Sequence, residues 1–192
     1  MKKIKAPIEV SARHIHLTKK DLEKLFGKGY ELEKFKDLSQ PGEFASNQTL
    51  TIQTKKHSIS GVRVLGPTRN YSQVEISKTD AYFLGLDPLI RESGKLEGTP
   101  GIELVGPNGK IKLKEGVILA TRHLHVSTKQ AKLHKLKHGQ FIKAEIKGGR
   151  ALIFENVMIK VAENYDWHLH LDTDEGNAAG IDKNNNTAVV IF

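Results

Sequence analysis

The chain contains two copies of the phrase Arg-His-x-His, at residues 13–16 and 122–125. In both copies an apolar stretch precedes the phrase and a hydroxyl residue follows it, Thr18 in the first copy and Ser127 in the second. The chain holds nine histidines in 192 residues, so random placement would give only about 0.4 His-x-His pairs. A third pair, His168 and His170, is also present. Repetition in matching contexts indicates a duplicated unit.

This spacing is typical of metal binding on a strand. Side chains at positions i and i+2 of a strand project to the same face, about 6.6 Å apart. Two imidazoles placed in this way can bind one ion through nitrogen at about 2.0–2.1 Å and leave room for a third ligand and a substrate. We therefore expect two metal-binding pairs, His14 with His16 and His123 with His125.

The third ligands are expected in the second half of each repeat, where Glu75 aligns with His170. Both lie in the middle of alternating apolar runs, and both precede an expected helix start. The predicted sites are His14, His16 and Glu75, and His123, His125 and His170. Three protein ligands are typical of a catalytic site, since a structural site usually has four. The alternative for Glu75 is a solvated strand residue, and for His168 an outer hydrogen-bond donor or an exposed side chain.

Composition narrows the chemistry. The chain has no cysteine, which excludes disulfides and thiolate zinc sites. Imidazole and carboxylate ligands suit zinc without excluding cobalt, nickel, manganese or iron. No run approaches the roughly 18 apolar residues of a membrane helix, and residues 1–7 offer no apolar signal region. We expect a cytoplasmic protein with no membrane partner.

The net charge is +8, with lysines spread along the chain and few aromatic residues among them. This distribution favours an anionic small molecule, such as a polyphosphorylated cofactor, at least as well as nucleic acid. A solvated basic surface is the alternative.

Short apolar runs separated by turn residues predict a mainly β fold with a few short capping helices. The repeat favours two small β-barrel domains, residues 13–120 and residues 121–192. Helices are expected to begin at Thr18, Ser77 and Ser127. Residues 85–101 are expected to connect the two halves, and loops of that length often carry function. Strands are expected at residues 8–10, 30–35, 49–54, 59–65, 73–76, 102–104, 110–113, 117–120, 141–146, 151–154, 157–161, 167–171 and 188–192.

Five segments in order resemble the phosphate propanoyltransferase (PduL-type phosphotransacylase) family. They are VSARHIHL at residues 10–17, VLGPTRN and QVEIS at 64–70 and 73–77, GTPGI at 98–102, RHLH at 122–125, and HLDTDEGNAA at 170–179. The resemblance covers nearly the whole chain. His168 stands where the family more often has an apolar or acidic residue.

The resemblance implies two β-barrels, with residues 1–12 packing into the second, and two zinc ions per chain. It assigns one ion to His14, His16 and Glu75 and the other to His123, His125 and His170, the same sets that the repeat indicates. It also implies that Arg69 binds phosphate. The implied reaction is acetyl-CoA or propanoyl-CoA plus phosphate giving acyl phosphate plus CoA. A homo-oligomer, with a dimer favoured, and a cytoplasmic location without a microcompartment-targeting extension are expected.

Without a cysteine nucleophile, direct attack of phosphate at a dinuclear zinc site is expected rather than an acyl-enzyme. Three other classes compete with this interpretation. A dinuclear metallohydrolase acting on thioesters or phosphoesters would use the same ligands to make hydroxide. A cupin-type oxygenase would need a Glu a few residues after His-x-His, where this chain has Thr18-Lys19-Lys20 and Ser127-Thr128-Lys129. A nucleic-acid-binding barrel would explain the charge but not the histidine pairs, so no nucleic-acid partner is expected.

Overall fold

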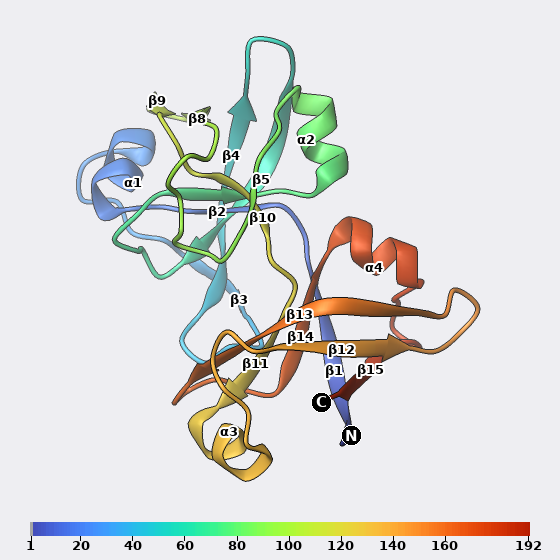
Figure 1. The fold of residues 1–192 in the computed structure, drawn as a ribbon. Coiled ribbons are helices and arrows are strands. Elements are labelled where there is room, and N and C mark those ends of the chain that lie inside the picture. The colour runs from blue at the N-terminus through green and yellow to red at the C-terminus, as the bar shows by residue number, and fades with distance from the viewer. Residues whose placement is uncertain (1) are drawn as a thin grey trace. The chain divides into compact units, whose positions relative to one another are not determined.

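The computed structural model describes residues 2–192 (Figure 1). The predicted mainly β class is confirmed, with 46% of the chain in strands and 15% in helices. Internal contacts divide the chain into two compact units. The barrel unit comprises the residues up to Ser11, Ser39–Pro41 and Thr121–Phe192. The sheet unit comprises Ala12–Leu38 and Gly42–Ala120.

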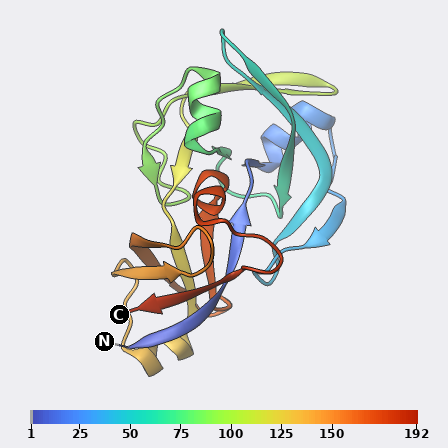
Figure 2. The ribbon, with the colours of Figure 1, turned by 90° about the vertical axis from the view of Figure 1, so that its right-hand side faces the viewer.

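Six strands close the barrel unit in the order β1-β14-β11-β13-β12-β15. They are β1 (Lys3–Ser11), β11 (His123–Ser127), β12 (Phe141–Ile146), β13 (Leu152–Ala162), β14 (His168–Asp172) and β15 (Thr187–Ile191). Its helices are α3 (Thr128–His134) and α4 (Thr173–Ala179). The first strand, β1, runs parallel to β14 and antiparallel to the last strand, β15. Figures 1 and 2 show β1 in blue beside β15 in red.

The sheet unit forms a nine-stranded half-barrel in the order β7-β10-β6-β2-β5-β4-β8-β9, with β3 paired to β4. Its strands are β2 (His14–His16), β3 (Lys34–Asp37), β4 (Phe44–Gln53), β5 (Ser58–Gly66), β6 (Gln73–Glu75), β7 (Ile90–Arg91), β8 (Ile102–Gly106), β9 (Gly109–Leu113) and β10 (Val117–Ala120). Its helices are α1 (Lys19–Phe26) and α2 (Lys78–Leu84).

Each unit has its own apolar core. The middle residue of each His-x-His phrase is fully buried there, Ile15 in one core and Leu124 in the other. Val74 and Leu169, each one residue before the expected third ligand, are also fully buried. Because side chains alternate along a strand, burial of these apolar residues turns the neighbouring histidines and Glu75 to the opposite face of the sheet.

The three predicted helix starts are confirmed. The side chains of Thr18, Ser77 and Ser127 each accept a hydrogen bond from the backbone N–H three residues later. Asp172 caps α4 in the same way. These helices have seven or eight residues and are too short to be stable alone. Their caps and their packing therefore set where they begin. Among residues 2–192, none of the helices has the length and hydropathy needed to span a membrane.

Three of the expected strands need correction. The strand expected at 30–35 forms later, at Lys34–Asp37, because Tyr30 stacks on Phe26 at 5.1 Å and accepts a hydrogen bond from Gln48. The strands expected at 151–154 and 157–161 are one continuous strand, β13. Within this strand Asn156 has a φ of 55°, a conformation that Asn tolerates. It lies opposite a shift in the β12–β13 register.

The sequence predicts that residues 85–101 connect the two halves of the chain, and this prediction is wrong. They lie within the sheet unit, between α2 and β8. Strand β7, which pairs with β10, and several hydrogen bonds hold the segment against that sheet. Leu119 donates to the carbonyl of Leu89, and the N–H of Gly94 donates to the side chain of Gln73 at 2.7 Å.

Candidate metal centres

The first predicted cluster assembles on β2 and β6 of the sheet unit. The antiparallel register places His14 opposite Glu75. The Nε2 atom of His14 lies 3.6 Å from one carboxylate oxygen of Glu75, and that of His16 lies 4.0 Å from the other. One ligand atom from each of the three residues lies within 4.8 Å of the others. All three predicted residues therefore meet in one place.

The second predicted cluster assembles in the same way on β11 and β14 of the barrel unit. The register places His123 opposite His170, and their rings stack with centroids 5.0 Å apart. The ring of His125 lies 4.4 Å from that of His170. Ligand nitrogens of these three residues also lie within 4.8 Å of one another. His168 lies opposite His125 but is not part of the three-residue group.

The backbone orients the leading imidazole of each cluster. The Nδ1 atom of His14 is 2.9 Å from the carbonyl oxygen of Ala12, and that of His123 is 2.8 Å from the carbonyl oxygen of Thr121. A carbonyl only accepts, so this contact assigns the ring proton to Nδ1 and leaves the Nε2 lone pair available. Metal-binding histidines usually have such a partner. The same contact occurs in both copies of the repeat.

The second histidine of each pair also favours a metal ion at each cluster. The Nδ1 atoms of His16 and His125 are buried and have no hydrogen-bond partner. Burying such an atom without a partner is unfavourable, and binding of a cation would compensate. Two histidines with one carboxylate, and three histidines, are both donor sets that suit zinc. The residues present therefore fit a metal ion at each cluster.

Electrostatics keep the carboxylate of the first cluster ionised. Burial alone would raise the pKa of Glu75, but His14, His16 and Ser93 hold it far below its usual range. Burial likewise would lower the pKa of His14, yet the adjacent Glu75 raises it above its usual value. Burial and the neighbouring His14 lower the pKa of His16. Metal binding requires an ionised carboxylate and neutral imidazoles, so the low pKa values of Glu75 and His16 favour it, whereas the raised pKa of His14 makes binding at this site compete with a proton.

The second cluster contains no carboxylate. Burial, followed by the charge of His123 and His170, holds the pKa of His125 far below its usual range. His125 is therefore neutral at physiological pH, as a metal ligand must be.

Arg69 lies beside the first cluster and is linked to it through one hydroxyl. Its guanidinium donates to Glu43 at 2.7 Å and to Tyr71 at 3.1 Å. It also donates to the Oγ of Ser93 at 3.2 Å. That hydroxyl donates to Glu75 at 3.0 Å. A cation able to bind an anion is thus held next to a candidate metal ligand.

Sequence reasoning did not single out Ser93, Gln73 or Glu43. Gln73 donates to both Ser93 and Glu75, at 2.8 and 2.6 Å. Ser93 lies in the 85–101 segment, whose length was the one indication that it carries function. Glu43 follows a turn and shares no spacing pattern with the ligands.

The fold and these clusters define a mainly β protein with two candidate metal-binding units of similar construction, one of them next to an arginine that is paired with Glu43. The chain belongs to the phosphate propanoyltransferase family, whose model matches residues 7–182. It is accordingly an acyltransferase.

Relatives named phosphate propanoyltransferase align over most of their length. That of Thermotoga maritima is 48% identical over 186 residues, covering 96% of this chain and 89% of the relative. That of Salmonella typhimurium is 48% identical over 177 residues, covering 92% and 84%. That of Enterococcus faecalis is 41% identical over 176 residues, covering 92% and 83%.

Proposed function

We propose that this chain exchanges CoA and inorganic phosphate on a short acyl group, either acetyl or propanoyl, and that two zinc ions per chain support the reaction. The observation that carries the zinc proposal is the pair of equivalent clusters, each with a backbone carbonyl fixing the leading imidazole. The substrates follow from the names of the relatives.

In this proposal each cluster binds one zinc ion. His14, His16 and Glu75 would hold one ion, and His123, His125 and His170 the other. A bound zinc ion supplies positive charge that deprotonates a coordinated thiol and stabilises a negative oxygen. The Nδ1 contacts to Ala12 and Thr121 keep the ring proton of the leading imidazoles on Nδ1, so Nε2 would be the atom that binds metal.

Arg69 would orient phosphate beside the first cluster. Its planar guanidinium matches two phosphate oxygens and stays charged at any physiological pH. Tyr71 and Ser93 hold that guanidinium from one side, and Ser93 connects it to Glu75. Phosphate would replace the Glu43 carboxylate as the acceptor of the hydrogen bond from Nη2 of Arg69.

We propose direct transfer. A phosphate oxygen attacks the thioester carbon, the carbon–sulfur bond breaks, and CoA leaves as its thiolate. The chain has no cysteine to form a thioester intermediate. Holding phosphate in place by Arg69 converts a bimolecular encounter into an intramolecular one, which is worth up to about 7–11 kcal/mol in well-oriented systems.

Thiol release tests this proposal. Acetyl-CoA and propanoyl-CoA are offered with and without phosphate to protein of measured metal content, and again after chelation. The proposal expects release that requires both phosphate and about two zinc ions per chain. Release without phosphate would favour a dinuclear metallohydrolase, and a trapped acyl-enzyme with ping-pong kinetics would contradict direct attack.

We also propose that the chain forms a homo-oligomer, most simply a dimer. Tyr82 and Phe83 on α2 support this, because these residues are 87% and 48% exposed and apolar surface of this kind favours association. Light scattering on the purified protein tests it, and a monomer at all concentrations would contradict it.

A further inference from the structure

The arginine that opens the first Arg-His-x-His phrase forms a two-bond ion pair within the sheet unit. Arg13 donates through Nε and Nη2 to the two oxygens of Asp80, at 2.8 and 2.7 Å. Asp80 is only 6% exposed. It is the third residue of α2 and completes the capping box with Ser77. The carboxylate that holds Arg13 is therefore itself held by the start of a helix.

The arginine that opens the second phrase also forms an ion pair, within the barrel unit. The Nε of Arg122 lies 2.8 Å from a carboxylate oxygen of Glu175. Glu175 is the third residue of α4 and completes the capping box with Asp172. The guanidinium of Arg122 also lies over the ring of Phe154, 5.1 Å from its centroid.

The two ion pairs occupy equivalent positions relative to the proposed ligands. Each arginine directly precedes the first histidine of its cluster. Each acid follows the third ligand by five residues, Asp80 after Glu75 and Glu175 after His170. The third ligand differs between the copies, and so does the length of the acidic side chain, yet both copies form the ion pair. Because the same ion pair occurs at the same position in two separate units, it is not explained by a chance contact at the surface.

In the sequence, each arginine lies between the histidine and the residue whose carbonyl orients that histidine. The carbonyl that contacts His14 belongs to Ala12, and the carbonyl that contacts His123 belongs to Thr121. Arg13 and Arg122 are the residues between carbonyl and histidine in these two contacts. Fixing the arginine side chain therefore restrains the backbone on both sides of the imidazole contact.

The other end of each ion pair restrains the third ligand. Helix α2 begins at Lys78, three residues after Glu75, and α4 begins at Thr173, three residues after His170. We infer that Arg13 and Arg122 are positioning residues of the two metal sites, each joining the backbone of the first ligand to the helix that follows the third. The inference rests on the proposed function, because it concerns the same two sites.

Zinc affinity tests the inference at one site at a time. The first site is measured in an H125A background and the second in an H16A background, by competition with a chromophoric chelator. R13Q is expected to weaken zinc binding at the first site about tenfold, the lower end of the effect of outer partners of metal ligands. R122Q is expected to do the same at the second site. R13K should recover only part of the loss, because an ammonium cannot reproduce the two-bond contact.

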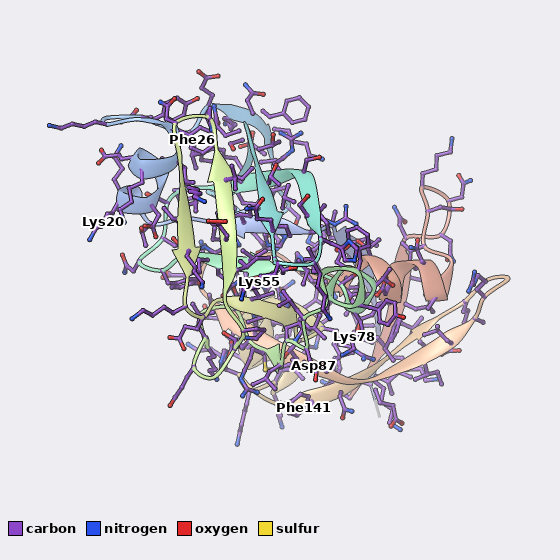
Figure 3. All side chains as sticks on the ribbon, turned by 90° about the horizontal axis from the view of Figure 1, so that it is seen from above. Lys20, Phe26, Lys55, Lys78, Asp87 and Phe141 are labelled. Carbon is purple, nitrogen blue, oxygen red and sulfur yellow. The ribbon has the colours of Figure 1, made fainter. Side chains whose placement is uncertain are left out.

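Two surface ion pairs provide matched controls. Lys78, the first residue of α2, pairs with Asp87 at 2.7 Å, and both side chains are largely exposed (Figure 3). Lys143 and Glu155 pair between β12 and β13 of the barrel. K78Q and K143Q remove a comparable charge without touching the capping boxes, so zinc affinity should not change. The melting temperature of each metal-free variant shows whether the fold is affected.

The expected result is weaker zinc binding with a metal-free melting temperature that matches the controls. Zinc affinities of R13Q and R122Q equal to those of K78Q and K143Q would overturn the inference and leave the proposed function standing, provided the unsubstituted chain binds two zinc ions. A fall in the metal-free melting temperature that accounts for the lost affinity would also overturn it, in favour of a purely structural ion pair. If R13Q does not fold, D80N removes the opposite charge of the same ion pair and keeps an oxygen for the helix cap. An unsubstituted chain that binds no zinc would refute the proposed function together with the inference.

Discussion

Arg69 is the residue on which the phosphate part of the proposal depends. Replacing it with alanine should lower kcat/KM for phosphate by about a hundredfold or more, the scale seen when one positioned donor is removed from an active site. Zinc content should not change, because Arg69 is not among the proposed ligands. Steady-state kinetics against phosphate and metal analysis of the same sample measure both quantities. Near-normal turnover of R69A would remove Arg69 from the phosphate role.

His14 and Glu75 predict a pH dependence of the metal-free protein. Glu75 raises the pKa of His14 above its ordinary 6.5, so E75Q should bring that pKa below 6.5, because burial then acts without the carboxylate. Ring resonances of His14 followed by NMR in chelator-treated protein measure this. A pKa that is the same in both proteins would contradict the coupling.

The same pair sets a window of stability. The folded pKa of His14 is raised, so its contribution is complete below 6.5 and is lost as the pH rises through the raised value. The folded pKa of Glu75 is lowered, so its contribution is complete above 4.5 and is lost as the pH falls. The difference in urea stability between the metal-free wild type and E75Q should therefore be largest between 4.5 and 6.5.

At the residue level, the assembly of the two three-residue clusters could be predicted because it combines strand alternation with duplication. The ion pairs of Arg13 and Arg122, and the bonds of Ser93, could not. Arg13 and Asp80 are 67 residues apart in the sequence, and Ser93 is 18 residues from Glu75. Which polar side chains meet over such distances depends on how strands pair, and local patterns do not encode that pairing.

Among the connecting elements, Gly101 lies where the chain leaves the 85–101 segment and enters β8. A Cβ atom there would lie 2.2 Å from the carbonyl oxygen of Leu113 and 2.6 Å from that of Lys114. Backbone atoms cannot move aside cheaply, so G101A should destabilise the protein by about 1–3 kcal/mol. G149A is the matched control, because nothing lies within 4 Å of the added atom. Denaturant unfolding compares the two, and equal stabilities would contradict the steric argument.

The elements themselves were predictable where a local side chain defines them. The caps at Thr18, Ser77 and Ser127 are of this kind, because a hydroxyl followed by an acceptor or donor three residues later acts within one turn. The continuity of β13 through Asn156 was not predictable. It depends on β12 pairing on both sides of the irregularity, and such support appears only in the folded sheet.

At the scale of the whole molecule, closure of the barrel depends on pairing between the two ends of the chain. β1 fills the position between β14 and β15, and Glu9 lies opposite the proposed ligand His170 in that register. Family resemblance implied that residues 1–12 pack into the second barrel, whereas the strand pattern alone gave no pairing partner. A strand with apolar and basic residues in alternation can pair with any compatible edge, so periodicity does not choose among them.

The placement of β1 predicts that a change in this strand affects the second metal site. Ala6 on β1 is fully buried in the barrel core, and an unpaired carboxylate there should cost about 3–5 kcal/mol. A6D should therefore destabilise the barrel unit and lower the zinc content from about two ions per chain to about one, because His123, His125 and His170 all belong to that unit. Lys3→Asp is the matched control, since it introduces the same carboxylate at an exposed position of the same strand.

The single tryptophan makes this test specific to the barrel. Trp167 lies in the barrel unit, and its ring N–H donates to the carbonyl of Lys5 on β1 at 3.1 Å. Its fluorescence therefore reports directly on whether β1 is in place. A6D should lower the denaturant midpoint observed by this fluorescence. Zinc at the site of His14, His16 and Glu75 should remain bound at denaturant concentrations where the ion of the barrel unit has been lost. Loss of both ions in a single transition at the tryptophan midpoint would instead mean that the two units unfold as one cooperative structure, and that the first site also depends on β1.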